Sequence, residues 1–385
     1  MKTRRTNIGD YLVAFGAWLM TRSTLTLVIL LVGIVVIRNG IRFSAWEASV
    51  DLALAALPSA SNYNSSALFS LLIAALLPET LRSGPLVTIL PQVVTLVVIA
   101  LIVRRRLILD TNGQASKAQR WAVIFAIGVS PIATLLMGNI GFARDWVPLL
   151  GLAMFVGARS RSVAIAGVVL AGLGNPEQTV FAIVLVLIAT WSPALSNYRR
   201  LAATGLVTSL LIYVPVQVWQ AVSGTESRAL FLIRNLHTTV VSFAPDAYIA
   251  VYASFSASWV VVVLWLAYSR RIGRIWPVLL GLLLGYVLMA FTTDGTRVFT
   301  IVATPLLLIA ILSIVQAPEG LVAQSDSPAT SHAGILGLIL VAGLFMPAVT
   351  WSVNAVLPAT SSVGSLLGVA RTLVSDGLNG PGASE

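Results

Sequence analysis

Two carboxylates, Glu47 and Asp51, lie four residues apart in the stretch that follows the first long apolar run of the chain. On a helix this spacing puts both side chains on one face. A carboxylate that faces a cavity can act as a general base and take a proton from a hydroxyl group. We therefore predict that Asp51 or Glu47 is catalytic, with Asp51 favoured because it lies deeper in the amphipathic segment. A solvated helix face that meets water and head groups is the competing interpretation.

Four further polar residues lie at the ends of short apolar runs. The string GNIGFARDW contains Arg144 and Asp145, and the string GNPEQ contains Asn175 and Glu177. At such ends these residues could contact a polar substrate or ligate a metal. An interfacial Arg–Asp pair, and a Glu favoured by the dipole at a helix start, explain the same residues without function.

Two cationic groups are candidates for binding phosphate. Asp294 and Arg297 lie three residues apart in TTDGTRVF, just before an apolar run. An Arg there can hold a phosphate through two parallel hydrogen bonds, although a local Asp–Arg pair closing a turn is the alternative. Arg228, Arg234 and His237 form a second cationic patch, which predicts either a pyrophosphate site or a solvated amphipathic face.

The composition indicates the class of protein that holds these residues in place. Of the 385 residues, 57% are hydrophobic and only 10% are charged, whereas soluble domains carry about 25% charged residues. This predicts a multi-pass membrane protein. The net charge of +10 then reflects basic cytoplasmic loops rather than nucleic-acid binding. The chain has no cysteine and two histidines, which excludes disulfides and makes a His-rich metal site unexpected.

The predicted fold is all-α, with about eleven transmembrane helices and two helices at the outer membrane surface. The surface helices are expected at 45–57 and 66–78, because the second run is too short for a span, which needs about 20 residues. The triplet of arginines at 104–106 favours the cytoplasm and supports this reading. The eleven predicted spans are 23–37, 85–103, 120–138, 146–158, 163–174, 179–194, 201–222, 248–269, 275–291, 298–315 and 335–357.

We expect one polytopic membrane domain over 1–357, with the N-terminus in the cytoplasm. Within it, 38–84 is the first outer loop and 316–333 is a polar cytoplasmic linker. Residues 358–385 are expected as a tail outside the cytoplasm. The short central runs predict helices that stop inside a cavity, as in broken membrane helices.

Several function classes find no support in the sequence. It contains no GxGxxG, P-loop or zinc signature, so ATP-driven transport by this chain is not indicated. No acid lies clearly inside a span, whereas ion-coupled carriers usually need one.

The architecture resembles the GT-C class of polyprenyl-phosphate-sugar-dependent glycosyltransferases. The shared features are a first span, a long outer loop with two surface helices and an early acid, and many spans joined by short loops. In that class an acid of the first outer loop commonly serves as base or metal ligand, which here implies Asp51 or Glu47. The resemblance covers about residues 1–315. The chain lacks an adjacent Asp–Asp or Asp–Glu pair in the loop and a large C-terminal soluble domain.

The resemblance implies a membrane enzyme that moves a hexosyl or pentosyl group from a polyprenyl-phosphate donor to a glycan, lipid or protein acceptor in cell-envelope synthesis. It would lie in the plasma membrane, as in a bacterial inner membrane, and any cofactor would be a divalent cation. An O-antigen polymerase or ligase-like enzyme centred on the loop 223–247 is one alternative. A flippase or transporter of a lipid-linked or small solute is the other.

Overall fold

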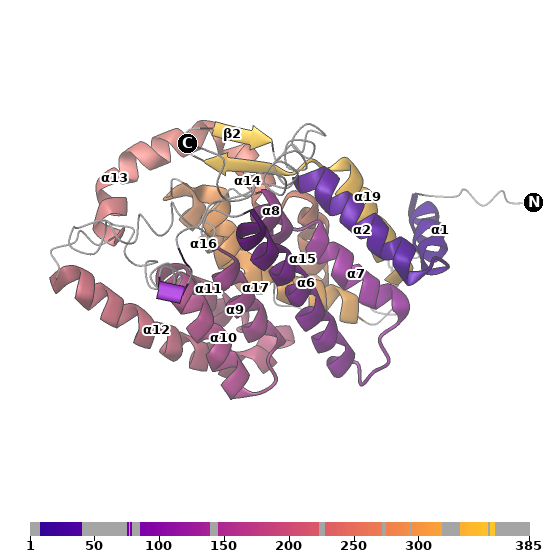
Figure 1. Cartoon of the computed structure of the whole chain (residues 1–385), viewed down its shortest axis with the longest axis horizontal. Coiled ribbons are helices and arrows are strands. Elements are labelled where there is room, and N and C mark those ends of the chain that lie inside the picture. The colour runs from indigo at the N-terminus through magenta and orange to yellow at the C-terminus, as the bar shows by residue number, and fades with distance from the viewer. Residues whose placement is uncertain are drawn as a thin grey trace, which may run out of the picture.

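A computed structural model describes residues 8–40, 75–76, 78, 85–138, 145–222, 228–271, 275–292, 294–317, 332–352 and 355–358. The described chain is a bundle of helices with one β-hairpin at its edge, which confirms the predicted all-α class (Figure 1). The predicted surface helices at 45–57 and 66–78 lie almost entirely outside the described residues, as do most of the linker 316–333 and the tail 358–385.

The helices vary widely in length. In chain order the elements are α1 (Ile8–Met20), α2 (Thr24–Asn39), α6 (Pro85–Asp110), α7 (Lys117–Gly128), α8 (Pro131–Gly138), α9 (Trp146–Gly157), α10 (Arg161–Gly174), α11 (Pro176–Ala189), η3 (Pro193–Tyr198), α12 (Arg199–Val222), α13 (Arg228–Phe243), η4 (Ala244–Asp246), α14 (Ala247–Phe255), η5 (Ser256–Ser258), α15 (Trp259–Arg271), α16 (Trp276–Ala290), α17 (Gly295–Gln316), α19 (His332–Phe345), β1 (Val349–Ser352) and β2 (Ala355–Pro358).

The prediction of eleven membrane-crossing helices is wrong. Among the described residues, three helical segments are long and apolar enough to cross a membrane: 195–219, 244–270 and 295–316. The pair α7 and α8, bent by 51°, would add a fourth if it counts as one span. The reason is helix length, because α9 has only 12 residues. At 1.5 Å per residue it is about 18 Å long, well short of the roughly 30 Å of a bilayer core.

Local sequence explains where two predicted spans break. The run 120–138 divides at Ser130, and α8 begins with Pro131, whose fixed φ suits the first position of a helix. The run 335–357 ends its helix at Phe345, because the residue before Pro347 is disfavoured in the helical region. The chain then forms an antiparallel hairpin in which Thr350 lies opposite Leu357.

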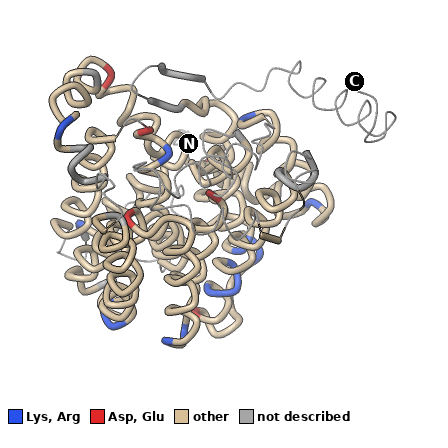
Figure 2. Tube along the Cα trace, turned by 60° about the vertical axis from the view of Figure 1, so that its left-hand side comes forward, with Lys and Arg blue, Asp and Glu red and all other residues tan. Residues whose placement is uncertain are grey.

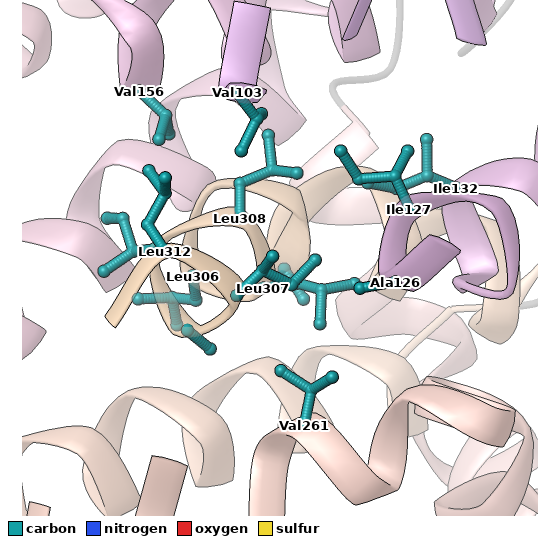
Figure 3. Packing of buried hydrophobic residues seen from close by; sticks show 14 of the residues in the cluster. Val103, Ala126, Ile127, Ile132, Val156, Val261, Leu306, Leu307, Leu308 and Leu312 are labelled. Atoms are coloured by element: carbon teal, nitrogen blue, oxygen red, sulfur yellow. The ribbon is translucent and has the colours of Figure 1, made fainter. Parts of the chain in front are cut away.

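Helix α17 is the central element of the bundle, and 94% of its most apolar 18-residue window is buried. Its leucines are surrounded by side chains from helices on several sides (Figure 3). The contributing residues from those other helices include Val103, Ala126, Ile127, Ile132, Val156 and Val261. A helix that is apolar on all sides belongs in a core. Because α17 is packed in this way, its first turn is held in a fixed place.

Helices α9 and α10 pack closely through glycine. A Cβ atom built on Gly151 would lie 2.5 Å from the backbone nitrogen of Ala171, and one built on Gly167 would lie 2.6 Å from the Gly151 carbonyl oxygen. Small residues of this kind allow two helix backbones to approach closely, as they do in membrane proteins. The contact fixes α9, whose first residue follows the acid of the site described below.

Charged residues are unevenly distributed over the bundle. Figure 2 shows several basic positions along its lower edge, whereas most of the acidic positions lie higher in the view. Asp110 is an acidic residue that lies among basic ones: it accepts hydrogen bonds from Arg106 at 2.7 Å and from Arg159 at 3.1 Å. A basic end of this kind is the pattern expected where loops face the cytoplasm.

Candidate functional site

Three of the predicted site residues meet in one ion cluster. The Arg297 guanidinium donates from Nε to Asp145 Oδ2 at 2.6 Å and from Nη2 to Asp145 Oδ1 at 2.7 Å. Its Nη1 donates to Asp294 Oδ2 at 3.5 Å. We refer to Asp145, Asp294 and Arg297 as the ion cluster. The predicted local pair between Asp294 and Arg297 is therefore present, but the shorter contacts are made to Asp145.

Two helix starts create this cluster. Asp145 immediately precedes α9, and Asp294 immediately precedes α17, in which Arg297 lies in the first turn. Carboxylates are favoured beside helix N-termini, where unpaired backbone N–H groups carry partial positive charge. Because α17 is the core of the bundle and α9 packs against it, the two starts are held next to each other.

The two ion pairs differ sharply in environment. The Arg297 and Asp145 side chains are 5% and 7% exposed, whereas the Asp294 side chain is 45% exposed. The bidentate fork to Asp145 is the strong geometry for Arg and carboxylate, and burial removes competing water. Asp294 makes one longer contact at the open edge, the kind that contributes little to stability. Of these two carboxylates, Asp145 therefore holds the guanidinium more firmly than Asp294 does.

A small hollow lies beside Arg297. Its lining includes the hydroxyl-bearing residues Thr134, Ser256, Thr296 and Thr300, and its volume is about 10 Å³. This is room for about one water molecule. The hollow is therefore too small for a phosphate group.

Asn175 and Glu177 lie at the start of α11. The Asn175 side chain accepts a hydrogen bond from the Gln178 backbone at 3.1 Å and caps the helix, which is the ordinary role of Asn there. Glu177 is buried, accepts from Gln217 at 3.5 Å, and lines a cavity of about 320 Å³. Thr292 and Val298 line the same cavity, so Glu177 lies close to the chain segment that carries the ion cluster.

The second cationic patch lies on α13, at the edge of the bundle (Figure 1). Arg234 and His237 are exposed on this helix, and Arg228 is its first residue. The pattern fits the solvated amphipathic face that was the alternative to a pyrophosphate site. The site role of these three residues stays a prediction.

The sequence alone did not single out two buried polar residues. Arg38, at the end of α2, donates from Nη1 to the Gly343 carbonyl at 3.2 Å and also to the Met346 carbonyl, and from Nη2 to Ser256 Oγ. Gln178 lines the cavity of Glu177, next to it in the chain. The only sequence signal was position, since Arg38 ends an apolar run and Gln178 belongs to the GNPEQ string.

Glu47, Asp51 and Arg144 lie outside the described residues, so the proposed base stays a prediction. Among the residues that the structure describes, no group of three or more His, Asp or Glu side chains gathers as metal ligands. No protein-family model, curated protein or solved structure matches this chain.

Proposed function

We propose that this chain is a multi-pass membrane glycosyltransferase that transfers a sugar from a polyprenyl-phosphate donor to an acceptor outside the cytoplasm. One observation carries the proposal. Asp145, Asp294 and Arg297, nominated from two separate sequence strings, meet in one cluster where two helix N-termini converge. Such a place favours an anionic group.

In the proposed reaction, the acceptor hydroxyl gives its proton to Asp51 or Glu47, and its oxygen bonds to the anomeric carbon of the donor sugar. The bond between that carbon and the phosphate oxygen breaks on the opposite face, and polyprenyl phosphate leaves with the bonding electrons. The catalytic need is electrostatic stabilisation of the leaving phosphate. The permanent charge of an Arg guanidinium suits this task.

The geometry suggests how Arg297 would meet the phosphate. Asp145 occupies the Nε and Nη2 edge through two short hydrogen bonds, while Nη1 points to the half-exposed Asp294 at 3.5 Å. We propose that the donor phosphate displaces Asp294 and bonds to Nη1. Asp145 keeps the guanidinium oriented throughout, so Asp145 is a positioning residue.

This scheme predicts opposite effects for two conservative variants. Arg297→Lys should lower the rate of sugar transfer by at least about tenfold, because an ammonium cannot bond Asp145 in a fork and reach the phosphate as well. Asp294→Asn should keep or raise donor affinity, because it removes the anion that competes for Nη1. Transfer and donor binding are measured separately in membranes supplied with polyprenyl-phosphate hexose and pentose donors.

The matched control is Arg105→Lys, at an exposed position of α6. Thermal unfolding of each purified variant in detergent shows whether Arg297→Lys remains folded. Wild-type transfer by a folded Arg297→Lys variant, or a loss of donor binding in Asp294→Asn, would contradict the proposed role of the cluster.

A further inference from the structure

The cavity of about 320 Å³ that Glu177 lines is bounded by α11, α13, α16 and α17. We refer to it as the α11–α17 cavity. Most of its wall is apolar, including Phe181, Leu236, Phe291 and Val302. Its volume lies at the lower end of the range of about 300–1,000 Å³ typical of small-molecule sites. A wall of this kind suits a hydrocarbon chain.

One buried polar side chain in this wall has no hydrogen-bond partner among the residues that the structure describes. Gln178 is 4% exposed, and neither its Nε2 nor its Oε1 has a hydrogen-bond partner among the residues that the structure describes. A buried polar group without a partner costs roughly 1–3 kcal/mol. The Gln178 backbone is fixed by its hydrogen bond to Asn175 Oδ1 at 3.1 Å. The carboxamide is thus a buried donor and acceptor at an apolar cavity.

The polar residues of the wall indicate which chemical group a ligand carries at its polar end, its head. A hydroxyl group can donate to Oε1 of Gln178 and accept from Nε2, and an amide can do the same. The carboxylate of Glu177 lines the same cavity, so an anionic head would meet a like charge there. Glu177 already accepts a hydrogen bond from Gln217 at 3.5 Å, so we assign the head to Gln178, whose neutral carboxamide matches a polar, uncharged group.

We propose that the α11–α17 cavity binds a single apolar chain that ends in an uncharged hydroxyl or amide, with the head bonded by Gln178. This site shares no residue with the ion cluster, and its ligand differs from a phosphate-bearing donor. The proposal therefore does not depend on the proposed transferase activity. The ligand can come from the bilayer as a neutral lipid or from solution as a long-chain alcohol.

The test uses the full-length protein in nanodiscs and three radiolabelled probes: monoolein within the bilayer, hexadecanol added from solution, and palmitate as the charged chain. Wild-type protein should bind monoolein or hexadecanol saturably and palmitate more weakly. Binding of monoolein alone would identify a bilayer lipid as the source, and binding of hexadecanol alone a soluble alcohol. Binding of neither, or tighter binding of palmitate, would overturn the proposal.

Gln178→Leu should weaken binding of the alcohol probes about five- to tenfold, because it removes the head contact and keeps the apolar wall. The matched control is Gln92→Leu in α6, because Gln92 is equally buried at 4% exposure but does not line this cavity. Val302→Phe, which narrows the cavity, should also weaken binding. Unchanged binding in both cavity variants, or an equal loss in Gln92→Leu, would contradict the assignment.

Discussion

Asp145→Leu is expected to lower the free energy of unfolding by about 3–5 kcal/mol, the usual cost of removing one partner from a buried ion pair. The substitution leaves the guanidinium of Arg297 in a site where its side chain is 5% exposed, with Asp294 as its remaining carboxylate in the ion cluster. Asp294 is half-exposed and 3.5 Å away, so it compensates poorly. Unfolding in detergent, followed by tryptophan fluorescence, measures the loss.

Two further variants test whether the loss of stability comes from the ion pair between Asp145 and Arg297. Asp294→Asn should cost less than about 1 kcal/mol, because exposed pairs contribute little. The double variant Asp145→Leu with Arg297→Met should recover to within about 1 kcal/mol of the wild type, because replacing both charges removes the stranded ion. A double variant no more stable than Asp145→Leu alone would show that the ion pair is not what the single substitution breaks.

Arg38→Met is expected to be the second most damaging change, at about 3 kcal/mol. Arg38 is buried and bonds the Gly343 and Met346 carbonyls at the end of α19, and also Ser256, where the chain breaks between α14 and α15. Each buried acceptor that loses its hydrogen bond from Arg38 lowers the stability of the fold by roughly 1–3 kcal/mol. Removing the buried charge of Arg38 offsets part of this loss.

The break at Ser256 makes this position sensitive. Ser256 has a φ of 50°, a left-handed conformation that costs a residue other than glycine roughly 1–3 kcal/mol. Its hydroxyl also donates to the Pro347 carbonyl at 3.0 Å, so it ties the break to the chain beyond α19. The control is Arg105→Met, at an exposed position of α6. Equal thermal stability of Arg38→Met and Arg105→Met would contradict the proposed role of Arg38.

The all-α class was predictable, because so apolar a composition leaves helices as the main way to satisfy the backbone in a bilayer. The number of spans was not. The apolar run 146–158 was counted as a span, but its helix α9 fills nearly the whole run with only 12 residues, or about three turns, which is too short to cross a bilayer core. Pro131 and Pro347 were visible breakpoints, and giving them more weight would have corrected two of the boundaries.

The three residues of the ion cluster were named from the sequence, but the pairing of Asp145 with Arg297 was not predicted. Asp294 is three residues from Arg297, so a local pair follows from spacing alone. Asp145 is 152 positions away, and only the packing of α9 against α17 brings it to the guanidinium. The same limit hid Arg38, whose partners lie 218 to 308 positions further along the chain.

The most direct test of the central claim measures sugar transfer by the purified wild-type protein in nanodiscs. The assay supplies radiolabelled polyprenyl-phosphate hexoses and pentoses together with an extract of cell-envelope glycans and lipids as acceptors. The account predicts a labelled product with wild-type protein. It also predicts its loss in Asp51→Asn or Glu47→Gln with donor binding retained, because a base matters only once the acceptor is activated. Absence of product with every donor, combined with movement of a labelled donor across proteoliposome membranes, would contradict the account and indicate a transporter.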